Sequence, residues 1–183
     1  FLHVDLDTVQ GWERYVQCYA VWLPDELRGE PAWQRFLQVA ERFSREVEKN
    51  AGCLRQLRAP GDLDSLEESG RHGAILTVES SAVLGGRLER IQDLRRLGVR
   101  MCTLTWNGET ELGRGGLAPG NTGLTGLGRQ AVPLMEEAGI LIDLSHARPE
   151  LFWDVAEMAH KPLVASHSNA KEVCAHPRNL EIS

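Results

Sequence analysis

Three short apolar runs in this sequence each end in a residue that could bind a metal ion. The runs ILIDL and LVA are each followed by Ser-His, which places His146 and His167 after consecutive runs, and residues 73–78 are followed by Glu79. Neutral imidazoles and a carboxylate are ligands of catalytic zinc sites, which keep one position open for water. Zinc lowers the pKa of that water to about 7 and polarises a carbonyl group. These residues therefore indicate metal-assisted hydrolysis.

Each candidate ligand also has a structural interpretation. A single histidine after a strand is more often a hydrogen-bonded structural residue than a ligand, whereas two of them, each preceded by Ser, favour a pair of ligands. Glu79 has the alternative roles of capping a helix or pairing with an arginine. His72, His160 and His176 fall in expected loops or at helix ends, and we interpret them as surface residues.

The elements that would position these residues alternate between short apolar runs and amphipathic stretches. We expect strands at 15–23, 73–78, 99–105, 140–144 and 163–166, and helices at 31–49, 88–97, 125–138, 149–159 and, as a short turn of helix, 171–174. The strands are apolar along their length, which is typical of a parallel sheet covered on both faces. Functional side chains of such sheets gather where the strands end.

Two parallel architectures fit this α/β order of elements. Five strands would make a complete small open sheet, or about five of the eight units of a (β/α)8 TIM-type barrel. Residues 1–183 contain no domain linker, so we expect one domain. The glycine-rich stretch 107–123 is long enough to be a functional loop rather than a mere connection.

The composition excludes several classes of protein. The 183 residues are 42% hydrophobic and 25% charged, as expected of a globular domain, and the net charge of -6 argues against nucleic acid or an anionic membrane as the partner. No apolar run approaches the roughly 18–20 residues of a membrane span. The four cysteines form no CxxC motif. With no signal peptide in view, we expect a reduced, cytoplasmic protein in which Cys18 and Cys102 are buried thiols.

The two ends of the sequence suggest a piece of a longer protein. The chain has no initiator Met, and it starts and stops within sequence that reads as ordered. A sheet of five strands would also have two open edges. We therefore expect such a chain to associate, for example as a homodimer.

Two segments carry a resemblance to a known family. "GLTGLGRQAVPLMEEAGILIDLSHA" (123–147) and "PLVASHSNAKEVCAHPRNL" (162–180) resemble the zinc-dependent membrane (renal) dipeptidase family, including its bacterial members. The resemblance implies a (β/α)8 barrel metallohydrolase domain, of which residues 1–183 cover about five units. It also implies two zinc ions bridged by a carboxylate and a hydroxide, and a dipeptide as the substrate.

The resemblance also implies a role for individual residues. Glu79 would be the bridging carboxylate, and His146 and His167 would bind the second zinc ion. Arg178, in the segment "HPRN", would bind the substrate carboxylate, for which a planar guanidinium is well suited. Without the resemblance, Arg178 would be interpreted as a surface arginine after a proline.

The sequence departs from the family in three places. Many members have a histidine after "TLT" that stabilises the developing oxyanion, but this chain has Trp106 there; we expect Trp106 to bind substrate and Asn107 to take a catalytic part. The first-strand HxD ligand pair is not matched, because His3-Val4-Asp5 aligns with the segment before the second strand. The acid/base Asp of a later strand lies beyond residue 183.

These departures leave two alternatives to a dipeptidase. One is another amidohydrolase-type metallohydrolase that acts on a cyclic amide or an ester. The other is a non-catalytic remnant that uses the barrel surface for binding, in keeping with Trp106 in place of histidine. Because one ligand pair and the proton carrier are not matched, we expect residues 1–183 alone to have little or no dipeptidase activity.

Overall fold

A computed structural model describes residues 5–9 and 11–181, and its centre is a parallel β-sheet. The sheet has six strands in the order β1-β3-β4-β5-β6, with β2 paired to the start of β3. Every strand pairing in it is parallel. The strands are β1 (Val16–Trp22), β2 (Leu54–Gln56), β3 (His72–Glu79), β4 (Val99–Thr103), β5 (Leu141–Asp143) and β6 (Leu163–Val164). The predicted α/β class is confirmed.

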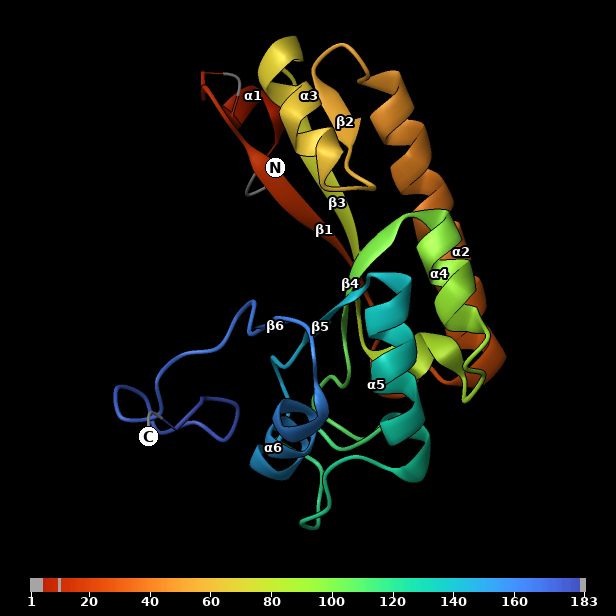
Figure 1. The fold of residues 1–183 in the computed structure, drawn as a ribbon, viewed down its shortest axis with the longest axis vertical. Coiled ribbons are helices and arrows are strands. Elements are labelled where there is room, and N and C mark those ends of the chain that lie inside the picture. Colours follow the sequence, from red (N-terminus) through yellow and green to blue (C-terminus); the bar gives the residue numbers. More distant parts are fainter. Residues whose placement is uncertain (1–4, 10, 182–183) are drawn as a thin grey trace.

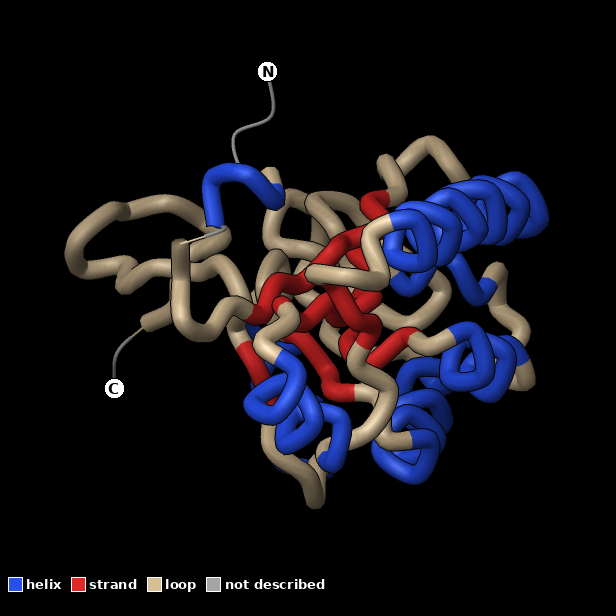
Figure 2. Tube along the Cα trace, turned by 90° about the horizontal axis from the view of Figure 1, so that it is seen from above, coloured by secondary structure: helices blue, strands red, loops and turns tan. Residues whose placement is uncertain are grey.

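Helices connect the strands and pack along the outer side of the sheet. They are α1 (Leu6–Val9), α2 (Gly29–Lys49), α3 (Gly61–Ser69), the 3-10 helix η1 (Ser81–Leu84), α4 (Arg90–Leu97), α5 (Gly126–Ala138) and α6 (Pro149–Met158). Helices α2, α4 and α5 lie side by side along one side of the strands (Figure 1). Seen from above, the strands form an inner layer with helices around part of it (Figure 2). No described helix has the length and apolar character that crossing a membrane requires.

The strand register aligns the carboxyl ends of the strands in a single row. Neighbouring strands pair residue by residue so that the row runs across the sheet through Trp22, Glu79, Thr103, Asp143 and Val164. Side chains of paired residues point to the same face of a sheet. Polar side chains from strands far apart in the sequence are therefore brought to one rim.

Helix α5 leads directly into the strand that precedes His146, and its ends are fixed as the sequence predicts. The side chain of Thr125 accepts a hydrogen bond from the backbone N–H of Gly128 at 3.0 Å, which caps the first turn. Gly139 ends the helix in the left-handed conformation (φ 67°). Pro133 lies inside the helix but on its exposed side, where the carbonyl that loses its partner can face water.

The structure differs from the sequence-based expectations in two connections. Strand β2 and helix α3 were not predicted, because three residues of strand and nine of helix are too short to show a periodic pattern. The short helix expected at 171–174 is a turn instead. The N–H of Lys171 donates to the carbonyl of Leu180 at 2.8 Å, so the segment pairs with the far end of the same loop rather than forming a helix.

Two single-residue interpretations are also corrected. Cys18 is exposed rather than buried, because β1 is an edge strand whose alternate residues have no layer packed on them; Cys102 is buried as expected. His72 is not a surface residue, since it starts β3, is 7% exposed and lies against the ring of Tyr15. His160 and His176 are exposed, as interpreted.

The glycine-rich loop folds back on the end of β4, and Gly115 is the point of closest approach. A Cβ at this position would lie 2.6 Å from the carbonyl oxygens of Asn107 and Gly108, and closer still to that of Trp106. We expect Gly115→Ala to lower the free energy of unfolding by about 3 kcal/mol, because backbone cannot move aside as a flexible side chain can. Chemical denaturation would measure this, and Gly126→Ala, where a Cβ meets nothing within 4 Å, is the control.

Candidate metal centre

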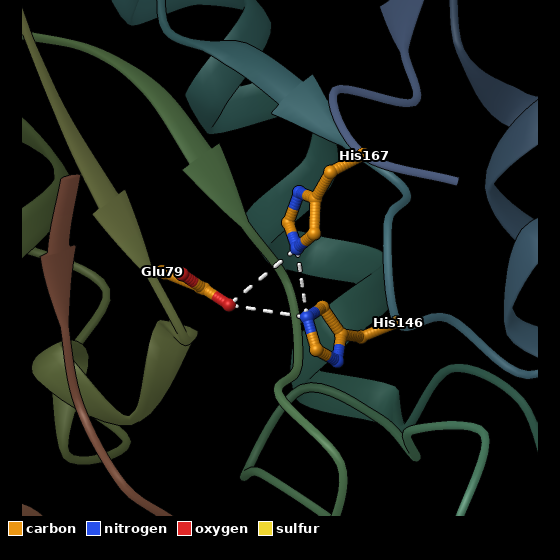
Figure 3. Close-up of side chains that lie close together, drawn as sticks. All are labelled: Glu79, His146 and His167. Carbon is orange, nitrogen blue, oxygen red and sulfur yellow. Dashed lines mark hydrogen bonds and ion pairs between the residues drawn. The ribbon is translucent and has the colours of Figure 1, made fainter. Parts of the chain in front are cut away.

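The three predicted ligands lie together at the rim of the sheet, as Figure 3 shows. Glu79 is the last residue of β3, and His146 and His167 follow the ends of β5 and β6. The Nε2 atom of His146 is 3.1 Å from Oε1 of Glu79 and 2.9 Å from Nε2 of His167. The Nε2 atom of His167 is 3.6 Å from the same carboxylate oxygen.

These three separations fit the coordination shell of a zinc ion. Tetrahedral zinc with bonds near 2.0–2.1 Å has ligand atoms about 3.3 Å apart, and the observed values lie on either side of this figure. The donor set of two imidazole nitrogens and a carboxylate oxygen is also the set that zinc prefers. Among the described residues, this is the one group of His, Cys, Asp and Glu side chains with such geometry.

The electrostatic surroundings keep Glu79 ionised. When the imidazole of His146 carries a proton on Nε2 as well as on Nδ1, its hydrogen bond to Glu79 is the largest influence, and it holds the pKa of the Glu79 carboxyl below its usual range against the opposing effect of burial. The positive charge of Arg178 acts in the same direction, as does that of His167 when its imidazole is protonated. The carboxylate is 19% exposed, so it remains open to a ligand.

His146 is held by the loop that follows β4. Its side chain is buried, and its Nδ1 atom lies 3.0 Å from Oδ1 of Asn107. An amide oxygen can only accept, so Nδ1 carries the proton and Nε2 is directed at Glu79. The backbone of His146 is left-handed (φ 67°), a conformation that few non-glycine residues adopt. The predicted site residue Asn107 therefore contacts a candidate ligand directly.

Arg178 reaches the same site from the loop after β6. Its NH2 group is 3.0 Å from Nε2 of His146, and its Nε atom is buried without a hydrogen-bond partner among the described residues. A Cβ at Gly116 would lie 3.3 Å from the carbonyl of Pro177, so the glycine-rich loop and the Arg178 loop are packed together. A guanidinium with an unpaired Nε can bind a carboxylate with two parallel hydrogen bonds.

Two indole rings form a wall beside the three candidate ligands. The ring of Trp106 is 5.1 Å from that of Trp22 and 6.2 Å from the imidazole of His146, measured between centroids. Trp22 is 47% exposed and pairs with Glu79 in the strand register. Trp106, predicted to bind substrate, therefore lies next to the site.

Two residues of this rim escaped the sequence-based prediction. Trp22 is the last residue of β1, and the position could have been found by noting what ends each strand. Asp143 is 1% exposed and accepts hydrogen bonds from the backbone of Ser145 and of Ser166. A lone carboxylate in the apolar run ILIDL was the available signal. Of the HxD segment His3-Val4-Asp5, His3 and Val4 lie outside the described residues, and Asp5 accepts hydrogen bonds from the backbone N–H and the hydroxyl of Thr8.

The contact between Asn107 and His146 makes a testable prediction. We expect Asn107→Ala to weaken zinc binding about 10-fold, since groups that orient a ligand imidazole typically contribute 10- to 100-fold in affinity. The dissociation constant, measured by competition with a chromogenic chelator, checks this. Asn121→Ala is the control, because Asn121 is exposed in the same loop. Equal affinities for the two variants would contradict the orienting role.

Comparison with known proteins assigns the fold. The chain is similar to the crystal structure of a dipeptidase of peptidase family M19, with a TM-score of 0.88 and 27% identity over 98% of this chain and 57% of that one. It is also similar to a metallopeptidase from Rhodobacter sphaeroides liganded with a phosphinate mimic of the dipeptide L-Ala-D-Ala, with a TM-score of 0.86 and 26% identity over 98% of this chain and 60% of that one. These similarities confirm the predicted (β/α)8 barrel type.

Comparison of sequences assigns the family. A curated relative is the uncharacterised protein in the pqqA 5'region of Klebsiella pneumoniae, 32% identical over 140 residues, which are 73% of this chain and 52% of the relative. The chain thus spans about half the length of that relative. Residues 1–181 match the family described as membrane dipeptidase, peptidase family M19. The chain therefore belongs to the membrane dipeptidase family M19, as its sequence motifs suggested.

Proposed function

We propose that the gene product containing this chain is a zinc-dependent dipeptidase. The observation that carries the proposal is the convergence of Glu79, His146 and His167 at separations of 2.9–3.6 Å. Membership of the M19 family supports a peptide bond as the target, and the solved relative that holds a dipeptide mimic supports a short substrate. Glu79, His146 and Arg178 would then act at one reaction centre.

Each side chain has a distinct task in this proposal. Glu79, His146 and His167 would hold a zinc ion, and Glu79 would be shared with a second ion if two are bound. When bound, zinc supplies a Lewis acid that polarises the peptide carbonyl and a water whose pKa is lowered to about 7. Asn107 keeps the proton of His146 on Nδ1, away from the centre.

Arg178 and the indole wall determine the substrate in this proposal. The guanidinium of Arg178, 3.0 Å from Nε2 of His146, binds the C-terminal carboxylate of the peptide. Because Arg178 lies beside the candidate ligands, the peptide carboxylate would be bound close to the cleaved bond. Trp106 and Trp22, which lie beside His146, would contact the substrate. Dipeptides are therefore preferred over longer peptides.

A substrate panel with controlled zinc tests the proposal. The gene product is incubated with dipeptides, a tripeptide, a cyclic amide and an ester, first with zinc, then after chelation, and again after zinc is returned. We expect hydrolysis of dipeptides that is lost on chelation and restored by zinc. Turnover of the cyclic amide or the ester alone would assign another amidohydrolase-type activity, and stoichiometric zinc without any turnover would indicate a binding protein. Either result would overturn the dipeptidase proposal.

A further inference from the structure

A single buried carboxylate joins the two turns that carry the histidines. Asp143 ends β5, is 1% exposed and accepts four hydrogen bonds. Its Oδ1 atom accepts from the backbone N–H of Ser145 and of Ser166, at 3.0 Å each. Its Oδ2 atom accepts from the hydroxyl of Thr103 at 2.8 Å and from that of Ser166 at 2.6 Å. The two serines directly precede His146 and His167, so the side chain of Asp143 holds the backbone of both turns.

We propose that Asp143 is a positioning residue which, through the hydroxyl of Ser166, fixes the proton of His167 on Nδ1 and so leaves its Nε2 free to bind a metal. The proposal deepens the zinc site and rests on it, since it assigns the group that prepares a zinc ligand. Asp143 does not touch the ligand atoms, so its effect on the imidazole ring of His167 is transmitted by Ser166.

The direction of each hydrogen bond follows from the number of protons available. Ser166 has one hydroxyl proton, and it donates that proton to Asp143. The Oγ atom of Ser166 is also 2.8 Å from Nδ1 of His167. Since its proton is already engaged, Oγ can only accept in this second contact. His167 must therefore donate from Nδ1, and the neutral imidazole carries its lone pair on Nε2.

A neighbouring hydroxyl completes the arrangement without competing for that proton. The Oγ atom of Ser145 accepts from the backbone N–H of His167 at 3.0 Å and lies 3.3 Å from Oγ of Ser166. Ser145 can donate its own proton to Ser166, because Ser166 still has a lone pair to offer. The backbone and the ring of His167 are thus both held by groups that Asp143 orders.

Both imidazoles then present the same kind of atom to Glu79. Asn107 holds the proton of His146 on Nδ1, as Ser166 does for His167. Two nitrogen lone pairs and a carboxylate oxygen consequently face one another within 3.6 Å. Three acceptors cannot hydrogen-bond among themselves, but they can share a cation. The Asp143 network thereby prepares the centre for metal, as outer carboxylates do for other ligand histidines.

The competing explanation is that Asp143 and Ser166 only join the ends of β5 and β6. In that case the loss of the Ser166 hydroxyl would change stability but not the position of the proton on His167. Nuclear magnetic resonance separates the two explanations, because two-bond nitrogen–proton correlations of a 15N-labelled imidazole show which ring nitrogen is protonated. The measurement is made without metal and at a pH of about 9, above the usual imidazole range. His167→Gln identifies the signals of His167.

We expect Nδ1–H at His167 in the parent protein and in Ser166→Thr, which keeps the hydroxyl. In Ser166→Ala we expect the proton to move largely to Nε2. The matched control is Ser168→Ala in the same loop, because the Ser168 hydroxyl is buried without a partner among the described residues. If His167 keeps its proton on Nδ1 in Ser166→Ala, the proposal is overturned. Asp143→Asn should also move the proton of His167 toward Nε2. If Asp143→Asn does not fold, the result for Ser166→Ala alone tests the proposal.

Zinc affinity provides the second measurement. We expect the dissociation constant for zinc to rise about 10- to 100-fold in Ser166→Ala and less than twofold in Ser168→Ala. Unchanged affinity in Ser166→Ala would contradict the proposal even if the proton moves. The proposed function has its own readout: a parent protein that fixes the Nδ1 proton but binds no zinc would reject the metal centre and keep the positioning role of Asp143.

Discussion

Replacement of Glu79 by glutamine is expected to abolish tight zinc binding while the protein stays folded. The amide keeps the shape of the side chain but removes the anionic donor that lies 3.1 Å from His146 and 3.6 Å from His167. We expect the zinc dissociation constant to rise more than about 100-fold, beyond the 10- to 100-fold effect of groups that only orient ligands. Dipeptide turnover by the gene product should fall at least as far. Chelator competition and an assay of released amino acid measure the two effects.

Glu41→Gln is the matched control for this experiment. Glu41 lies on the exposed side of α2, where it pairs loosely with Arg45 at 3.9 Å. The same change of charge there should leave zinc affinity and turnover within twofold of the parent. Thermal unfolding of both variants shows whether they are folded. A Glu79→Gln protein that is folded and still binds zinc as tightly as the parent would refute the proposed centre.

Replacement of Arg178 by methionine is expected to change substrate preference rather than metal binding. The guanidinium approaches His146 with NH2 and has a buried, unpaired Nε, so a peptide carboxylate can take both donors. A charge-assisted bond of this kind contributes up to about 3 kcal/mol. This corresponds to roughly a 100-fold rise in the Michaelis constant of a dipeptide, at 1.4 kcal/mol for each factor of ten.

A dipeptide whose C-terminal carboxylate is replaced by an amide separates this role from a structural one. It lacks the negative charge, so its Michaelis constant should change by less than about threefold in Arg178→Met. Arg178→Lys should be intermediate for the acid, because lysine keeps the charge but lacks the planar fork. Equal losses for the acid and the amide would show that Arg178 supports the site without binding the carboxylate.

The candidate ligands could be predicted from sequence because strand ends are encoded locally. An apolar run followed by a polar residue marks the end of a buried strand, and parallel strands end at the same edge. Glu79, His146 and His167 were found in this way. Asp143 belongs to the same class but lies inside an apolar run, a pattern that predicts a buried strand and not a site residue.

The rest of the site depends on loop closure, which leaves no periodic signal in the sequence. Asn107 meets His146 because the glycine-rich loop turns back, with Gly115 donating to the carbonyl of Gly108 at 2.7 Å. Arg178 reaches the same place through the loop after β6, in which the expected helix at 171–174 is replaced by pairing between the two ends of the loop. Only the family resemblance predicts a role for Arg178. Contacts between loops distant in the sequence cannot be read from local pattern alone.

The left-handed backbone at His146 has a consequence for protein engineering. Among the described residues, the non-glycine positions with positive φ are Ser80 (99°) and His146 (67°), one next to a candidate ligand and the other a candidate ligand itself. Such a conformation costs roughly 1–2 kcal/mol, and glycine relieves it. A library selected for heat resistance alone should therefore enrich glycine at both positions. The second of these changes would remove a candidate metal ligand, so selection for stability alone would work against the proposed centre.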